Sequence, residues 1–469
     1  IFIPSMNIHE HQAKELLNSI IKIKKKNITH NLTLASDTTF YYPKNYDDLK
    51  KLLIYLKNIK KKVLIKSGGC GYGDKSNLQE SEYAISLSKL NKIIKFDKKR
   101  KTVTAQAGIS IYELFFYLKE KEHIIFNVPG GKSVSLGGGI SGNVHGRPSK
   151  KNYANFGDNI ISLKVMFENG KIKLITKKNK IFRNIIGSLG VYVIILEAKL
   201  RIHKISNRFV EKASRTVASE SEFKSYEKNL ATCYGYINHF NADTFEGSFV
   251  HFVPKANVKK EKVVQLKSYS LLKLSNFFKI PFVISFFVNP YTLKIIYDML
   301  FYLKKNFTIF NKSEIFTLER SMYFDLIQVL PNFHRGGLIE IQFDVQRNKL
   351  FNLITALKKI FFHFNVFPSA FVLKKAITSK KNYIFNFPKN NFSITLTFSK
   401  KDYNNNKIFF KNFYQLLFKN KCNQYLTKNE TFLDNIHSQN KKKYFNLNLF
   451  IKSKILSSDF KEKILSLIS

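Results

Sequence analysis

The spacing of apolar and polar positions predicts an α+β first part of the chain. Leucines recur at helical spacing over residues 46–59, which predicts an amphipathic helix. Ser110 is followed three positions later by Glu113, a pair typical of a capping box, and opens a second helix through residue 117. Short apolar runs predict strands at residues 63–66, 84–87, 93–96, 103–107, 160–167, 171–175 and 191–202, with Asn169-Gly170 as a hairpin turn.

A second pattern begins near residue 203, where aromatic residues become frequent and glycines sparse. Polar and apolar residues alternate over residues 338–345, a helix is predicted over 350–361, and a further strand over 392–398. Strands and a helix around an antiparallel sheet are typical of a separate substrate or cap domain. The end of the chain, after residue 420, is predicted to finish in a lysine-rich helix.

The composition adds a large positive charge to this picture. The 78 Lys and Arg against 33 Asp and Glu give a net charge of +45, which favours nucleic acid or an anionic membrane as a partner if the charges cluster. The lysines are instead spread in short runs, and Phe, Tyr, Asn and Ile are abundant while Trp is absent, as A/T-rich codons produce. We interpret the charge as a solvated surface and expect no specific nucleic acid. A basic polyanion-binding protein without enzymatic activity stays open.

The number of cysteines and the hydropathy of the chain limit the cellular compartments in which we expect the protein. Cys70, Cys233 and Cys422 are too few for a disulfide scaffold or a Cys-rich zinc site, so we expect no metal and a reducing compartment. Charged residues interrupt the region where a signal peptide would need an apolar core, and the longest apolar run, residues 280–288, is shorter than the ~20 residues of a membrane span. We expect a cytoplasmic protein, with peripheral contact at the inner membrane surface left open.

Two glycine-dense loops carry the strongest chemical signal. The first, Ser67 to Asp74, follows a strand, and the second combines Pro129-Gly130-Gly131 with the stretch from Ser135 to Gly146. Glycines let backbone N–H groups approach a phosphate closely. Neither loop fits a Rossmann or P-loop pattern. A single loop would be interpreted as a tight turn, but two such loops in one domain favour a pyrophosphate cradle.

The loops resemble those of the vanillyl-alcohol oxidase / p-cresol methylhydroxylase superfamily of FAD enzymes, most strongly from Lys66 to Leu200. Family segments Gly-Arg-Ser-Tyr-Gly-Asp, Pro-Gly, Gly-Gly-Ala-Ile and His-Gly match residues 69–74, 129–130, 137–140 and 145–146. The resemblance implies non-covalent FAD, because the first loop has no histidine that would attach it. It implies cofactor contacts by Gly68, Gly69, Cys70, Gly71, Tyr72, Gly73, Asp74, Pro129, Gly130, Ser135, Gly137, Gly138, Gly139, Ser141, Asn143, His145, Gly146, Gly190 and Ile194.

Within the superfamily the chain is most similar to the decaprenylphosphoryl-β-D-ribose 2-oxidase branch, through four C-terminal segments at residues 340–343, 371–374, 387–398 and 425–428. This likeness implies a two-subdomain FAD-binding domain made of residues 1–202 and a returning segment 420–469, with an antiparallel cap domain at 203–419. It also implies substrate contacts by Arg147, Gln342, Lys374, Ser393 and Thr395.

Several positions depart from the family pattern. Cys70 replaces an arginine, Val193 a glycine, Glu340 a glutamine, and Ser393 and Thr395 an asparagine and a cysteine. Lys66 lies close enough in sequence to substitute for the lost phosphate contact. FAD binding tolerates these changes more readily than recognition of one particular sugar.

Oxidation of a secondary alcohol needs hydride transfer to the flavin and a group that takes the hydroxyl proton. His145, Lys428 and Tyr72 are the candidates, against the plainer interpretations of a packed histidine, a surface lysine and a stacked loop aromatic. A lysine acts as a base only if its pKa is lowered, and otherwise stabilises the alkoxide.

We therefore expect an FAD-dependent oxidoreductase acting on the CH–OH group of a sugar-type substrate. The resemblance implies polyprenylphosphoryl-ribose, oxidised at the 2-position as the first half of an epimerisation in cell-wall arabinose biosynthesis, with a short-chain reductase as partner. An alditol or aldonolactone oxidase is the alternative enzyme, disfavoured because the His-x-Gly-Lys segment of those enzymes is not found in the C-terminal sequence.

Overall fold

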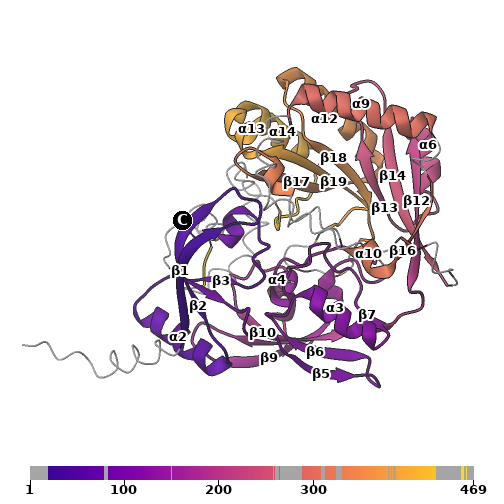
Figure 1. The fold of residues 1–469 in the computed structure, drawn as a ribbon. Coiled ribbons are helices and arrows are strands. Elements are labelled where there is room, and N and C mark those ends of the chain that lie inside the picture. The colour runs from indigo at the N-terminus through magenta and orange to yellow at the C-terminus, as the bar shows by residue number, and fades with distance from the viewer. Residues whose placement is uncertain are drawn as a thin grey trace, which may run out of the picture.

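The computed structural model describes residues 20–78, 83–148, 150–256, 258, 263–264, 288–307, 312–323, 330–378, 381, 383, 387–428, 456–458 and 461. These residues form two parts. The part that carries the glycine loops lies below, and a large antiparallel sheet with helices stands above it (Figure 1).

Two sheets and a short ribbon build the glycine-loop part. Its strands are β1 (Ile21–Ile28), β2 (Ala35–Tyr42), β3 (Leu64–Lys66), β4 (Tyr83–Ser86), β5 (Ile93–Asp97), β6 (Thr102–Gln106), β7 (His123–Ile124), β8 (Ile160–Met166), β9 (Ile172–Thr176), β10 (Ile194–Arg201) and β11 (His203–Lys204). One sheet is mixed, in the order β1-β2-β4-β3, and the other is antiparallel, in the order β5-β6-β10-β8-β9. The predicted hairpin is confirmed by the β8–β9 pairing.

Both predicted helices of this part are confirmed. Helix α2 (Tyr46–Asn58) buries its leucine face, and α3 (Ile111–Glu120) begins with the predicted capping box between Ser110 and Glu113. The second glycine loop contains a short helix that was not predicted, α4 (Leu136–Ser141), whose N-cap Ser135 accepts a hydrogen bond from the backbone of Gly138. Another short helix is α5 (Phe182–Ile185).

The upper part is the predicted antiparallel cap sheet. Its strands are β12 (Phe209–Val217), β13 (Cys233–Ile237), β14 (Gly247–Lys255), β15 (Val263–Val264), β16 (Glu314–Thr317), β17 (Leu338–Val345), β18 (Ala370–Lys375) and β19 (Phe392–Ser399). They follow the order β15-β16-β12-β14-β13-β18-β19-β17, antiparallel except for β15 with β16. Its helices are α6 (Glu220–Glu227), α9 (Pro290–Asn306), α10 (Leu318–Met322), α12 (Leu350–Phe364), α13 (Lys400–Asn405) and α14 (Lys407–Lys419). Helices α6, α9 and α12 lie on the side away from the glycine loops (Figure 1).

Strand β17 positions the candidate site. Its apolar residues, such as Ile341 and Phe343, join the core with α12 and α14. Its polar residues Glu340, Gln342 and Asp344 are buried as well. The predicted alternation of polar and apolar residues in β17 therefore separates two faces that are both buried. The polar face is buried because it is turned toward the glycine-loop part.

The end of the chain returns to the glycine-loop part where it is described. Leu456 is fully buried and forms a parallel bridge with Val63. The helix predicted at the very end lies largely outside the described residues, and the domain boundaries stay predictions. No helix in the described portion is both long and apolar enough to cross a membrane.

Candidate active site

A cleft of about 970 Å³, partly open to solvent, lies between the two glycine loops. Nine predicted cofactor residues line it, namely Gly68, Gly69, Cys70, Gly71, Ser135, Gly137, Gly138, Ser141 and Gly190. The cleft therefore joins both glycine loops around one space, as a cradle for a dinucleotide requires.

The close approach of the loops explains why glycine is needed at two positions. A Cβ on Gly68 would lie 2.1 Å from the Ser133 carbonyl oxygen, and one on Gly146 would lie 1.7 Å from the Val128 carbonyl oxygen. Ser67, beside Gly68, lines the cleft with a buried hydroxyl that has no hydrogen-bond partner among the described residues. The backbones approach too closely for a Cβ at Gly68 or Gly146, and both this close packing and the spare Ser67 hydroxyl fit a bound FAD.

Lys66 and Cys70 stand at the rim of this cleft. Burial lowers the pKa of Lys66 to about 8, with a contribution from Lys25, and its ammonium donates to the Asn27 side-chain oxygen. Burial raises the pKa of the Cys70 thiol to about 11, so this cysteine stays a neutral thiol at pH 7. A neutral thiol is a poor nucleophile, which fits the expectation of non-covalent FAD.

Other predicted cofactor residues lie behind or beyond the cleft lining. Gly139 packs against Ile111, the Asn143 side-chain oxygen accepts from the Gly157 backbone, and Ile194 is buried in β10. The lining found among the described residues also leaves out Tyr72, Gly73, Asp74, Pro129, Gly130, His145 and Gly146. The cofactor roles of these residues stay predictions.

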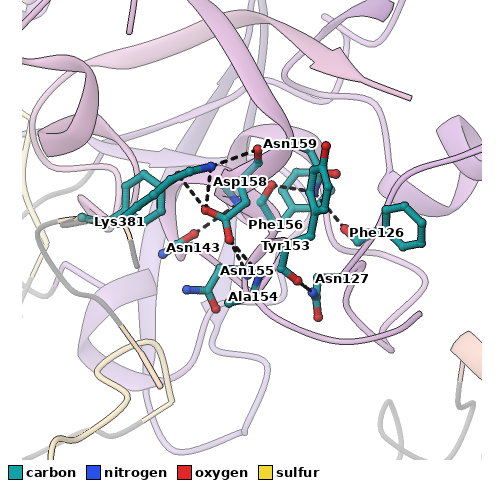
Figure 2. A network of polar contacts seen from close by, with 12 residues as sticks. Phe126, Asn127, Asn143, Tyr153, Ala154, Asn155, Phe156, Asp158, Asn159 and Lys381 are labelled. Atoms are coloured by element: carbon teal, nitrogen blue, oxygen red, sulfur yellow. Dashed lines mark hydrogen bonds and ion pairs between the residues drawn. The ribbon is translucent and has the colours of Figure 1, made fainter. Parts of the chain in front are cut away.

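A polar network centred on Asp158 lies beside the second loop, whose Asn143 is among the residues drawn in Figure 2. The Asp158 carboxylate accepts hydrogen bonds from the backbone N–H groups of Ala154 and Asn155, at 2.8 and 3.1 Å. Lys381 forms an ion pair with it at 3.1 Å, and the Tyr383 hydroxyl donates to it at 3.0 Å. Both partners follow the cap strand β18 in the chain, so the network ties the cap to the loop.

His145 lies where the second loop meets β17. Its Nε2 is 3.4 Å from the side-chain nitrogen of Gln342, and its ring neighbours those of Phe387 and Tyr425. Its Nδ1 is buried without a hydrogen-bond partner among the described residues. Burial, together with nearby Lys374 and Lys428, lowers the pKa of His145 well below 6.5, so the imidazole is neutral at pH 7.

Lys374 and Arg147 add positive charge beside this histidine. Burial, together with charge repulsion from Arg147 and Lys428, lowers the pKa of Lys374 to about 8. The guanidinium of Arg147 lies over the rings of Tyr234 and Phe252, with its carbon 5.1 and 4.4 Å from the ring centres. Aromatic faces stabilise a cation, and a guanidinium is also the side chain best suited to binding a planar anion.

Glu340 is the carboxylate of this cluster, and it forms an ion pair with the ammonium of Lys428. The Tyr72 hydroxyl also hydrogen-bonds to it, and burial followed by Glu340 raises the pKa of Tyr72 well above 10. Tyr72 therefore stays protonated and acts as a donor. Its ring stacks on His30, with ring centres 5.7 Å apart.

The remaining predicted substrate residues lie on β19, next to the same cluster. Ser393 pairs across the sheet with Lys374, and Thr395 pairs with Gln342. The Ser393 hydroxyl is buried with no partner in the described part of the chain. The five predicted substrate residues and the other two catalytic candidates, Tyr72 and Lys428, thus belong to one cluster with His145, while their individual roles stay predictions.

Sequence reasoning did not assign several residues of the site. Thr427 lines the cleft and donates to the Gly142 carbonyl oxygen at 2.8 Å, and Tyr425 packs on His145. Both belong to segment 425–428, whose family likeness indicated Lys428, so the same likeness could have indicated Tyr425 and Thr427 as site residues. His30 lies near the first loop through chain folding alone, and its sequence context carries no signal of this.

Residues 38–176 match the family model of an FAD binding domain. A putative D-arabinono-1,4-lactone oxidase from Neurospora crassa is 26% identical over 194 residues, covering 41% of this chain and 34% of the relative. A decaprenylphosphoryl-beta-D-ribose oxidase from Mycolicibacterium smegmatis is 25% identical over 143 residues, covering 30% of this chain and 31% of the relative. The chain thus matches about a third of the length of each relative.

A solved structure extends the likeness to almost the whole chain. Cholesterol oxidase from B. sterolicum superposes with a TM-score of 0.72 at 12% identity, over 96% of this chain and 98% of that one. This likeness confirms the predicted fold class. The match to an FAD-binding domain confirms FAD as the cofactor, and the oxidase relatives support an oxidoreductase.

Proposed function

We propose that this chain is an FAD-dependent oxidoreductase that oxidises a secondary hydroxyl of a sugar-type substrate. The observation that carries the proposal is the neutral His145, held by the second glycine loop against the polar face of β17. A neutral imidazole keeps one ring nitrogen able to accept a proton, which alcohol oxidation requires. When bound, FAD supplies the hydride acceptor.

The surrounding residues supply the remaining functions. Tyr72 is a donor and Lys428 is already paired with Glu340, so His145 is the better proton acceptor of the three candidates. Lys374 and Arg147 stabilise negative charge on the substrate oxygen or on an anionic group of the substrate. The apolar rings of Phe387 and Tyr425 beside His145 help to exclude water, which strengthens these electrostatic interactions.

The charge balance of the cluster favours an anionic substrate. Among the described residues, the cluster contains three cationic side chains, Arg147, Lys374 and Lys428, and one carboxylate, Glu340. The site therefore holds an excess of positive charge. A polyprenylphosphoryl-ribose, with its phosphodiester, matches this balance and agrees with the ribose oxidase relative. The 2-epimerisation role and the reductase partner belong to this proposal. Aldonolactones are the second candidate, because lactone oxidases are among the relatives.

Anaerobic mixing of the flavin-loaded protein with candidate substrates tests the proposal. A short-chain polyprenylphosphoryl-ribose, an aldonolactone and an alditol are compared by the rate at which each bleaches the flavin absorbance. We expect reduction by the phosphorylated ribose, and reduction slowed by about 10²–10⁴ in His145→Gln. Reduction by the lactone alone would select the second candidate, and reduction by none of the three would contradict a sugar oxidase.

A further inference from the structure

The outer face of helix α9 is apolar and exposed. Tyr291, Ile295 and Met299 follow one another at four-residue spacing and are 76%, 67% and 57% exposed. Tyr297 and Phe301, on the opposite side of the helix, are buried against the cap at 7% and 2% exposure. A surface helix ordinarily has polar residues on its outer face, so this helix exposes an apolar face in addition to its buried seam.

The position and charge of α9 limit what can cover this face. The helix lies along the outer side of the cap, away from the glycine loops (Figure 1). Its charged residues are Lys294, Lys304 and Lys305 together with Asp298, which is ion-paired with Lys294. The whole chain carries a net charge of +45. Two copies of such a chain repel each other, whereas an anionic surface attracts it.

We propose that this apolar face of α9 docks onto an anionic lipid surface. Helices that lie in a membrane interface combine an apolar face, aromatic residues and flanking lysines, and they bind more strongly to anionic lipids. Tyr291 and Tyr302, 76% and 64% exposed, supply the amphipathic rings common at that depth. This inference goes beyond the oxidase proposal and does not depend on it, because the candidate active site described above takes no residue from α9.

The lack of tryptophan in the sequence makes a direct test possible. Tyr291→Trp places a single tryptophan on the proposed surface, and Leu174→Trp places one on β9 of the glycine-loop part, where Leu174 is 65% exposed. Each flavin-loaded variant is mixed with vesicles of phosphatidylcholine alone or with phosphatidylglycerol added. For Tyr291→Trp we expect a blue shift of the tryptophan emission and protection from acrylamide quenching when the vesicles contain phosphatidylglycerol. Salt should reverse both changes. Neither change is expected with phosphatidylcholine alone, or for Leu174→Trp with either kind of vesicle. A tryptophan that is already protected without vesicles in Tyr291→Trp would mean that the chain itself covers the face, which overturns the proposal.

Sedimentation with the same vesicles gives an independent measurement. Ile295→Glu combined with Met299→Glu should lower binding at least about tenfold, because a charged residue enters the apolar layer unfavourably. Leu174→Glu is the matched control and should bind as the parent protein does. Unchanged binding by the double variant would overturn the proposal. So would a parent dimer in vesicle-free solution that the double variant converts to monomer, since the face would then serve self-association.

Discussion

Replacement of Lys374 by Met is expected to stabilise the protein while impairing the site. Lys374 is half-buried beside Arg147 and Lys428, and no carboxylate among the described residues forms an ion pair with it. Its charged form therefore costs free energy in the folded state. Met keeps most of the apolar stem and removes the charge.

The size of the effect follows from the pKa. Folding lowers the pKa of Lys374 from 10.5 to about 8. At 1.36 kcal/mol for each pH unit, this difference corresponds to about 3 kcal/mol of lost stability at neutral pH. Lys374→Met should recover up to that amount in the free energy of unfolding.

The stability cost of the charged Lys374 depends on pH. Below pH 8 the lysine is charged in both the folded and unfolded states, so the full cost is present. Between about pH 8 and 10.5 the folded protein loses the proton first, and the cost shrinks. The advantage of Lys374→Met should therefore fall to about 1 kcal/mol at pH 10.

Urea unfolding of the parent protein and the variant at pH 7 and pH 10 measures this difference. The neighbouring Lys375 is the matched control, because it is ion-paired with Glu227, whose side chain is 1% exposed. Lys375→Met leaves that buried carboxylate with Arg347 as its ion-pair partner and should destabilise by about 1–3 kcal/mol. The same two variants also separate function, because only Lys374→Met should weaken the binding of an anionic substrate. A Lys374→Met protein that is less stable than the parent at pH 7, or equally stabilised at pH 7 and pH 10, would refute the reasoning.

Three further predictions concern other parts of the site. Gly68→Ala should abolish flavin binding, because its Cβ would clash at 2.1 Å, whereas Gly131→Ala, with its nearest contact at 3.4 Å, should keep the flavin absorbance. Glu340→Gln should lower stability by about 1–3 kcal/mol, since it removes the negative charge from an ion pair whose carboxylate is largely buried, while Glu314→Gln, with a more exposed carboxylate paired to Lys212, should cost under about 1 kcal/mol; equal losses in urea unfolding would contradict this. Because the pKa of His145 is well below 6.5, the rate of flavin reduction should stay level from pH 7, where Lys374 is already mostly charged, to pH 6, and a fall centred near pH 6.5 would show a charged imidazole.

Sequence patterns predict the parts of the fold whose signals are local. The leucine spacing of α2, the capping box of α3 and the Asn169-Gly170 turn each depend on residues a few positions apart, and each prediction agrees with the structure. Strand β1 escapes prediction, because its lysine-rich sequence is exposed along most of its length and shows no apolar face. Helix α4 escapes prediction because glycines dominate it, and its hydrogen bonds depend on the packing of the loop.

The candidate site shows the same division. Glycine density indicates the cleft, because positions where two backbone segments approach closely allow only glycine, and this restriction is visible in the sequence. The pairing of Glu340 with Lys428 joins positions 88 residues apart, and the stacking of His30 on Tyr72 joins separate segments. Such contacts depend on how the sheets pack together, which local patterns do not encode.

The central claim is that two glycine loops hold FAD without a covalent bond. An absorbance spectrum of the purified full chain, followed by acid precipitation and a spectrum of the supernatant, tests it most directly. We predict flavin bands in the native protein and release of FAD into the supernatant, with both lost in Gly68→Ala. A parent protein that is colourless and cannot be reconstituted with FAD would contradict the account, and flavin retained in the precipitate would contradict the non-covalent mode of binding.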